Sequence, residues 1–216
     1  MRIKINFSCE NVTLPNNNKH VVSYLHKCLG NKNRYHDMVS NYSVSQMLNG
    51  KISKCGKEIT YTNPYFYISS NDLEFINTFI TGVNNFNFLG DIKFKNIEFV
   101  SDKIYNDYNH FRTLGSGVLL KSCGIYYDVN HELFLDKLKE NIVHRYELLR
   151  NKKMDNALNI TISKSKTKTV LYNEKPYIVS DIIFTIHNNK EISEFIYNNG
   201  LGKSTGCTFG FIVINK

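Results

Sequence analysis

The pattern of apolar and polar positions predicts several strands in the first half of the chain. Residues RIKINFS (2–8) and DIKFKNIEFVS (91–101) alternate between apolar and polar side chains, which is the period of a half-buried strand. The segment ITYTNPYFYISS (59–70) is rich in β-branched and aromatic residues, which favour strands. Residues 34–48 are ambiguous: a short helix near 35–39 is followed by a strand-like YSVSQML.

Two amphipathic helices are expected between these strands. Apolar residues recur three and four positions apart from Val21 to Leu29, and Gly30 ends this helix. Asn71 or Asp72 is expected to cap a second helix that runs to about residue 82. The first half of the chain therefore has the order β-α-β-β-α-β.

The second half repeats this order. TLGSGVLLKS (113–122) is expected to be a strand with a glycine-rich bend, and Asn130 is expected to cap a long helix that ends near Lys152. The remaining predicted elements are a hairpin of residues 157–170 and 175–187, a helix over 190–199 and a strand over 207–215.

Two successive β-α-β-β-α-β units predict an α+β protein made of two tandem ferredoxin-like (RRM-like) domains. The short polar segment 102–113 separates the units, so the expected domains are 1–110 and 111–216. A hydrophobic fraction of 42% in 216 residues is enough for both domains to have a core.

Composition narrows the class of partner. The formal net charge of +8 favours a polyanion, either a nucleic acid or an anionic membrane surface, although mild basicity is common among soluble proteins. No apolar run is long enough to span a membrane, and the N-terminal segment lacks the apolar core of a signal peptide. A cytoplasmic protein without a membrane partner is therefore expected.

The sequence carries no sign of a metal site. Its five cysteines stand singly, without a CxxC pair, which disfavours a zinc knuckle or ribbon. It also lacks an HExxH motif and a cluster of acidic residues, so a metal-dependent nuclease is disfavoured. We expect no metal and no cofactor.

The C-terminal segment GLGKSTGCTFGFIVIN is rich in glycine. Glycine permits positive φ and close backbone approach, so the loop amides could face a phosphate. A nucleotide-binding P-loop is excluded because it needs a glycine where Tyr197 stands and a long helix after Lys203. The alternative is a tight turn that joins a helix to the last strand.

Three lysines, Lys164, Lys166 and Lys168, stand at a period of two in the predicted hairpin. Side chains at this spacing share one face of a strand, and a row of ammonium groups suits an RNA backbone. The alternative is a solvated edge strand, which lysines protect from pairing.

Two histidines near the first helix suggest metal-free RNA cleavage. Attack by a ribose 2′-hydroxyl on the adjacent phosphate needs a proton acceptor, a proton donor and a cation for the developing charge. His26 lies on the polar side of the helix beside Lys27, and His36 follows the helix. The alternative for each histidine is a tolerated surface residue.

Taken together, the segments resemble the Cas six family of CRISPR repeat-RNA endoribonucleases, members of the RAMP superfamily. The resemblance covers nearly the whole chain in the right order. It rests on the strand RIKINF, the Leu14-Pro15 turn before the helix VVSYLHKCL, the segments GVLLKS and YELL, the hairpin ITISKSKTKTV and YIVSDIIFTI, and the tail GLGKSTGCTFGFIVI.

The resemblance implies cleavage of precursor CRISPR RNA within the repeat, without a metal, to leave a 2′,3′-cyclic phosphate. His26 and His36 match the positions that relatives use for catalysis, as general base or acid. Asn41 and Tyr42 occupy the region where relatives often have a lysine, so Tyr42 and Lys27 are candidates for orientation and charge. The expected RNA-binding residues are Lys27, Lys121, Lys164, Lys166, Lys168, Gly202, Lys203, Ser204 and Thr205.

Two rival functions stay open at this point. The chain could be a non-catalytic RNA-binding subunit of a CRISPR effector complex, which would not need the histidine pair. An unrelated RRM-like module is disfavoured because neither half has the aromatic-rich strand that stacks bases in such modules. If the chain is an endoribonuclease or an effector subunit, its partner is CRISPR repeat RNA. Other effector subunits are further candidate partners, and a monomer or homodimer is the expected state.

Overall fold

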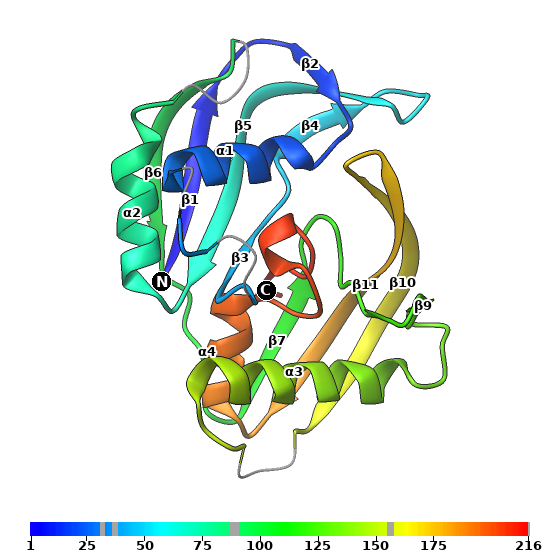
Figure 1. Ribbon diagram of the computed structural model, residues 1–216. Coiled ribbons are helices and arrows are strands. Elements are labelled where there is room, and N and C mark those ends of the chain that lie inside the picture. The colour runs from blue at the N-terminus through cyan, green and yellow to red at the C-terminus, as the bar shows by residue number, and fades with distance from the viewer. Residues whose placement is uncertain (31–32, 36–38, 87–90, 155–157, 216) are drawn as a thin grey trace.

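The computed structural model describes residues 1–30, 33–35, 39–86, 91–154 and 158–215. Within these ranges the chain forms two α/β units, each an antiparallel sheet with two long helices on one face (Figure 1). No helix in these ranges is long and apolar enough to cross a membrane.

The first unit contains β1 to β6 with α1 and α2. Its sheet has the order β2-β5-β1-β6, and β3 and β4 also pair with β5. Alternate residues of β1, including Ile3, Ile5 and Phe7, face the helices and are buried. The elements are β1 (Arg2–Ser8), β2 (Val12–Pro15), α1 (Lys19–Leu29), β3 (Tyr42–Val44), β4 (Leu48–Ile52), β5 (Glu58–Ser70), α2 (Leu73–Val83) and β6 (Lys93–Val100).

The second unit has the sheet order β10-β11-β7-β12. As in the first unit, the first and third strands of the β-α-β-β-α-β series are central, which is the ferredoxin-like arrangement predicted from the sequence. The elements are β7 (Tyr108–Thr113), β8 (Lys121–Ser122), β9 (Ile125–Tyr126), α3 (Phe134–Arg150), β10 (Ile160–Tyr172), β11 (Lys175–His187), α4 (Lys190–Asn199), a 3₁₀ turn (Thr205–Cys207) and β12 (Ile212–Ile214).

Local sequence signals placed several boundaries correctly. Asp72 caps α2, and its carboxylate accepts a hydrogen bond from the Phe75 N–H at 3.1 Å. The β10–β11 hairpin turns at Asn173 and Glu174, whose φ values of 50° and 65° are those of a two-residue hairpin turn. α4 covers Lys190–Asn199, as predicted.

Other boundaries were wrong where tertiary contacts override the local pattern. The predicted strand over 113–122 is mostly a loop, because Gly115 and Gly117 have φ values of 86° and 84°. The first strand of the second sheet is β7, so the predicted division after residue 110 falls inside this strand.

The predicted ends of α3 and of the last strand were also wrong. α3 begins after Leu133, and the Asn130 amide instead donates to the Thr167 hydroxyl at 3.0 Å. The last strand begins at Ile212, because the preceding residues turn through Thr208 and Gly210, which have φ values of 70° and 63°.

A buried arginine joins the two units. The guanidinium of Arg2, on β1, lies between the rings of Tyr197 and Phe211, at 3.5 and 4.5 Å from their centroids. It also donates a hydrogen bond to the Tyr197 carbonyl. Burial lowers the pKa of Arg2 to about 10, so the group stays charged at neutral pH. This contact fixes the first strand of one unit against α4 and the residue that precedes β12 (Ile212–Ile214) of the other.

We expect Gly210→Ala to be far more damaging than Gly56→Ala, although both glycines have positive φ (63° and 72°). A Cβ at Gly210 would lie 1.7 Å from the Leu201 carbonyl oxygen, whereas Gly56 has open space. Gly56→Ala should lower the free energy of unfolding by about 1–2 kcal/mol, the cost of a left-handed backbone, and Gly210→Ala by roughly 2–5 kcal/mol. Urea denaturation of both variants measures the difference, and equal losses would contradict the proposed clash.

Candidate functional site

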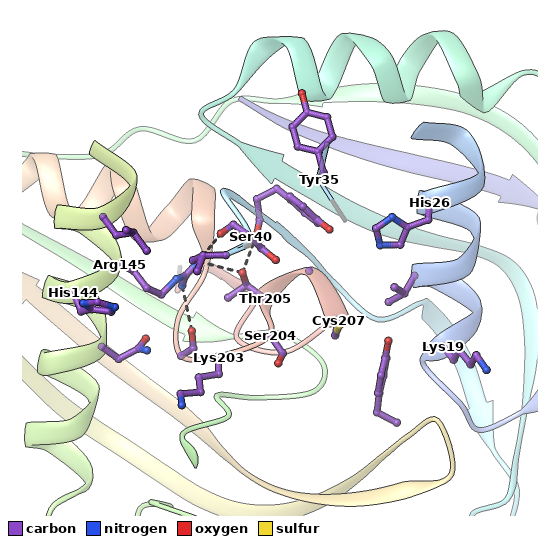
Figure 2. Close-up of a pocket in the computed structure, with 18 of the residues that line it drawn as sticks. Lys19, His26, Tyr35, Ser40, His144, Arg145, Lys203, Ser204, Thr205 and Cys207 are labelled. Atoms are coloured by element: carbon purple, nitrogen blue, oxygen red, sulfur yellow. Dashed lines mark hydrogen bonds between the residues drawn. The ribbon is translucent and has the colours of Figure 1, made fainter. Parts of the chain in front are cut away.

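A cavity of about 760 Å³ opens between the two units. We call it the central cavity. Helix α1 borders it on one side and α3 on the other, and the loop of residues 202–207 lies between them (Figure 2). Ser40 and Tyr42, which follow α1 in the sequence, also line it.

The central cavity is basic. Lys19 and His26 of α1, His144 and Arg145 of α3, and Lys203 of the loop line it. No carboxylate is present among the described residues that line it. Positive charge without a compensating acid attracts an anion, so the cavity suits a phosphate-bearing ligand.

Arg145 holds the glycine-rich loop in place. Its buried guanidinium donates hydrogen bonds to five acceptors within the described residues, over distances of 2.8 to 3.3 Å. The acceptors are the carbonyls of Ser40, Asn199, Gly200 and Gly202 and the hydroxyl of Thr205. Burial lowers the pKa of Arg145 to about 10, which leaves the group charged at neutral pH. Its charge is therefore engaged in the protein and shapes the cavity wall.

Several backbone amides of the glycine-rich segment bond within the protein. The N–H groups of Leu201, Lys203 and Cys207 donate to the carbonyls of Gly210, Leu119 and Ser204, each at 2.8 Å. The amides of Leu201, Lys203 and Cys207 therefore do not face a ligand, and for the rest of the loop the expectation that amides face a phosphate stays a prediction. The loop contributes the side chains of Lys203 and Ser204 to the cavity, and part of its backbone holds its own shape.

Thr205 and Gly202 make contacts that hold the loop, and the prediction that they bind RNA stays a prediction. The Thr205 hydroxyl donates a hydrogen bond to the Tyr42 carbonyl at 2.8 Å and accepts one from Arg145. It therefore already acts as donor and as acceptor within the protein. Gly202 is buried, and a Cβ there would lie 2.5 Å from the Leu119 carbonyl oxygen. In contrast, Lys203 and Ser204 are exposed and line the central cavity.

The predicted catalytic residues are partly brought together. His26 points from α1 into the central cavity (Figure 2), whereas His36 lies outside the described residues. Tyr42 also lines the cavity, but its ring is buried and stacks on Phe75 with the centroids 4.3 Å apart. Burial raises the pKa of Tyr42 to about 12. Its hydroxyl is therefore protonated at neutral pH and can donate a hydrogen bond, but it cannot act as a base there.

Tyr42 also explains why Gly206 is a glycine. A Cβ at Gly206 would lie 2.7 Å from both the Tyr42 hydroxyl and the Ser40 hydroxyl. The loop therefore packs directly on the tyrosine, which brings residues 42 and 206 together across the boundary between the two units.

Several predicted RNA-binding lysines lie away from the central cavity. Lys27 is exposed and borders a separate groove between α1 and α2, and it does not line the central cavity. Lys164, Lys166 and Lys168 do share one strand face, opposite Ile183, Asp181 and Val179 of β11. Lys168 forms an ion pair with Asp181 at 2.8 Å, and none of the three lines the cavity. Lys121 borders a smaller cavity next to the central one.

Sequence reasoning missed the role of Arg145, although the sequence carried a signal. Position 145 is seven residues after Leu138, three after Ile142 and four before Leu149, so it falls on the apolar stripe of α3. A charged residue on such a stripe indicates a buried, paired group. Lys19, Asn141 and Tyr172 also line the cavity, and only their tertiary position reveals this.

In the part of the chain that the structure describes, no three His, Cys, Asp or Glu side chains are close enough to hold a metal ion.

We expect Arg145→Lys to destabilise the protein, with Arg150→Lys as the matched control on the same helix. A lysine cannot reproduce the planar fork that serves five acceptors, and buried carbonyls would lose their donors. The free energy of unfolding should fall by roughly 3 kcal/mol in Arg145→Lys and by less than about 0.5 kcal/mol in Arg150→Lys, since Arg150 is exposed. Denaturant unfolding tests this, and a stable Arg145→Lys would show that the five bonds do not hold the loop.

Comparison with known proteins identifies what the chain is similar to. Residues 99–214 match the family model described as "CRISPR associated protein Cas6, C-terminal". The chain is 27% identical over 241 aligned residues to the CRISPR-associated endoribonuclease Cas6 1 of Methanocaldococcus jannaschii, with 99% of this chain and 92% of the relative covered. It is 29% identical over 178 residues to a putative CRISPR-associated endoribonuclease-like protein Cas6 of Pyrococcus furiosus, with 76% and 73% covered.

Solved structures share the fold over the full chain. The product of a Cas6-related gene from Pyrococcus furiosus superposes with a TM-score of 0.85 at 24% identity, covering 100% of this chain and 98% of that one. A RAMP protein described as binding different RNA substrates also gives 0.85 at 24% identity, with 100% of both chains covered. A Cas6 product complex gives 0.68 at 10% identity, with 99% and 98% covered.

Proposed function

The chain belongs to the Cas6 family, and we propose that it is an endoribonuclease that cuts precursor CRISPR RNA within the repeat. The observation that carries this proposal is the basic cavity between the two units, with His26 inside it and no lining carboxylate among the described residues. Names of relatives support the same activity, since the Methanocaldococcus jannaschii relative is named an endoribonuclease.

The reaction that suits this cavity is internal transesterification of RNA. The ribose 2′-oxygen attacks the adjacent phosphorus, a P–O2′ bond forms, and the P–O5′ bond breaks, which leaves a 2′,3′-cyclic phosphate and a 5′-hydroxyl. A base removes the 2′-hydroxyl proton and an acid protonates the leaving 5′-oxygen. This route uses no metal ion.

We assign the roles to residues that line the cavity and to His36, which lies outside the described residues. His26 acts as general base or general acid, and His36 supplies the other proton-transfer group, as expected from the sequence. Lys19 and Lys203 face the same cavity and can stabilise the charge that develops on the phosphate. Tyr42 can act only as a donor at neutral pH, because burial raises its pKa to about 12.

The second candidate function is binding of CRISPR repeat RNA without cleavage. One observation favours it: Asn41 and Tyr42 occupy the region where relatives often have a lysine. The Asn41 amide donates to the Asp72 carboxylate at 3.2 Å, and Tyr42 is buried, so neither position offers a cation. A place in an effector complex, a cytoplasmic location and a monomeric or homodimeric state remain predictions.

We expect repeat RNA to be cleaved in EDTA and the His26→Ala variant to be slower by about 10²–10⁴-fold, the usual contribution of a general acid or base. His131→Ala is the matched control, because His131 lies outside the central cavity. Single-turnover cleavage of 5′-labelled RNA measures the rate, and a 5′ product that resists phosphatase until acid opens the ring carries the cyclic phosphate.

Binding without cleavage in the wild-type protein would replace the enzyme by the binding function. Cleavage that survives His26→Ala and His36→Ala together would show that the residue assignment is wrong.

We expect Lys203→Ala to weaken RNA binding, because the lysine contacts a phosphate. The slope of the log binding constant against the log salt concentration should become shallower by about one. Its ammonium makes no ion pair or hydrogen bond within the described residues, so it is available. Lys54→Ala, in the turn between β4 and β5, is the control and should leave the slope unchanged. Filter binding at several salt concentrations tests the difference, and identical slopes would remove Lys203 from the RNA path.

A further inference from the structure

Two smaller cavities adjoin the central cavity at different places. One, of about 280 Å³, shares Tyr35 and Tyr42 with it, and we call it the acidic cavity. The other, of about 250 Å³, shares His144 and Lys203 with it, and we call it the side cavity. Figure 2 shows His144 and Lys203 at one end of the central cavity and His26 on the far side. The charge of each smaller space decides whether an RNA backbone can follow it.

The acidic cavity does not suit an RNA backbone. Asp72 lines it, and the Arg34 guanidinium lies 3.4 Å from the Asp72 carboxylate and 2.8 Å from the Glu74 carboxylate. One cation is thus shared between two carboxylates, so the cluster keeps a net negative charge. The Asn41 amide, also at this cavity, donates to Asp72 at 3.2 Å and adds no charge. A phosphate placed here would be repelled.

The side cavity has the opposite charge. Lys121, Lys137 and Lys203 line it, and Glu140 is the one carboxylate among the described residues there. The Lys137 ammonium lies 2.7 Å from the Glu140 carboxylate and neutralises it. The charges of Lys121 and Lys203 are therefore left without a compensating acid in this space. Two such cations next to a basic cavity attract a second phosphate.

The Lys121 ammonium is held in position by neutral groups. It donates a hydrogen bond to the Tyr126 hydroxyl at 3.2 Å and lies 4.4 Å from the centre of the Tyr126 ring. The two residues are also direct neighbours across β8 and β9. An ammonium has three N–H donors, so one bond to a hydroxyl leaves two donors for a ligand.

His144 stands where the side cavity meets the central cavity. Its side chain is exposed, and neither ring nitrogen forms a hydrogen bond with a described residue. Glu147 lies one turn further along α3, but the Met154 N–H and the Lys153 ammonium bond its carboxylate at 3.2 and 3.3 Å. These two groups are the main causes of the lowered pKa of Glu147, and His144 adds a smaller attraction. His144 therefore has an N–H to offer a phosphate in either protonation state.

We propose that the side cavity binds a phosphodiester of the RNA, next to the nucleotide in the central cavity, through His144 and Lys121. This inference rests on the proposed function, because it requires RNA in the central cavity. Lys203 lines both spaces, so the strand passes this side chain on its way from one to the other. The RNA backbone thus continues between α3 and the β8–β9 hairpin, and the acidic cavity stays outside its path.

The test uses the full chain and repeat RNA with a 2′-deoxyribose at the cleavage position, which removes the attacking hydroxyl so that the RNA binds without being cut. If the wild-type protein binds but does not cut, unmodified RNA serves. Fluorescence anisotropy should show that His144→Ala and Lys121→Ala each bind about fivefold more weakly, as expected for one hydrogen bond to a phosphate. Lys57→Ala, which is exposed and lines neither cavity, is the matched control and should bind like the wild-type protein.

Uncharged linkages separate a phosphate contact from a structural effect. In a set of RNAs, each has one methylphosphonate in place of a phosphodiester, which removes one negative charge at a time. One linkage next to the scissile one should weaken wild-type binding about fivefold. The same change should have little effect in His144→Ala, because the contact is already lost. The melting temperature of His144→Ala should equal that of the wild-type protein, since the side chain is exposed.

Wild-type affinity in either His144→Ala or Lys121→Ala, or an equal loss in the wild-type protein and His144→Ala at every linkage, would overturn the second phosphate site while RNA binding stands. Failure of the wild-type protein to bind repeat RNA would overturn the proposed function together with this inference.

Discussion

The arrangement of the two units depends on one buried cation, Arg145. The loop that follows α4 presents a row of backbone carbonyls that no strand or helix satisfies, and the guanidinium supplies the donors for four carbonyls and one hydroxyl. Only a planar group with several fixed N–H bonds can serve so many acceptors at once. Because one of the carbonyls belongs to Ser40 of the first unit, the same side chain holds the loop and ties the two units together.

Arg2 supports this arrangement from the opposite side of the boundary between the units. Its guanidinium lies on the rings of Tyr197 and Phe211, which flank the glycine-rich segment in sequence. The loop is thus fixed at both ends, by an arginine from α3 and an arginine from β1. Gly206 and Gly210 leave no room for a side chain, so the backbone itself forms the packed surface. The central cavity keeps its shape because the loop that lines it contacts both units.

This anchoring separates cations that hold the fold from cations that remain for a ligand. Arg2, Arg145 and Lys168 contact protein acceptors or rings, whereas Lys203 projects into the cavity from a backbone that is already bonded. His26 faces it across the cavity from the first unit. A phosphate-bearing chain laid in the cavity would therefore touch residues of both units, and any reaction there requires the units to stay in this relative position.

The sequence by itself determined the order of strands and helices, the ferredoxin-like class and the resemblance carried by the glycine-rich tail. Periodicity and caps act over a few residues, so Asp72, the turn at Asn173 and the bounds of α4 could be read directly. Only the tertiary structure decided which charged residues are available to bind a ligand. Arg145 and Thr205 are engaged by partners tens of residues away, and the lysines of β10 lie on a face that the cavity does not reach. Burial and hydrogen bonding between distant segments set these roles, and no local pattern records such contacts.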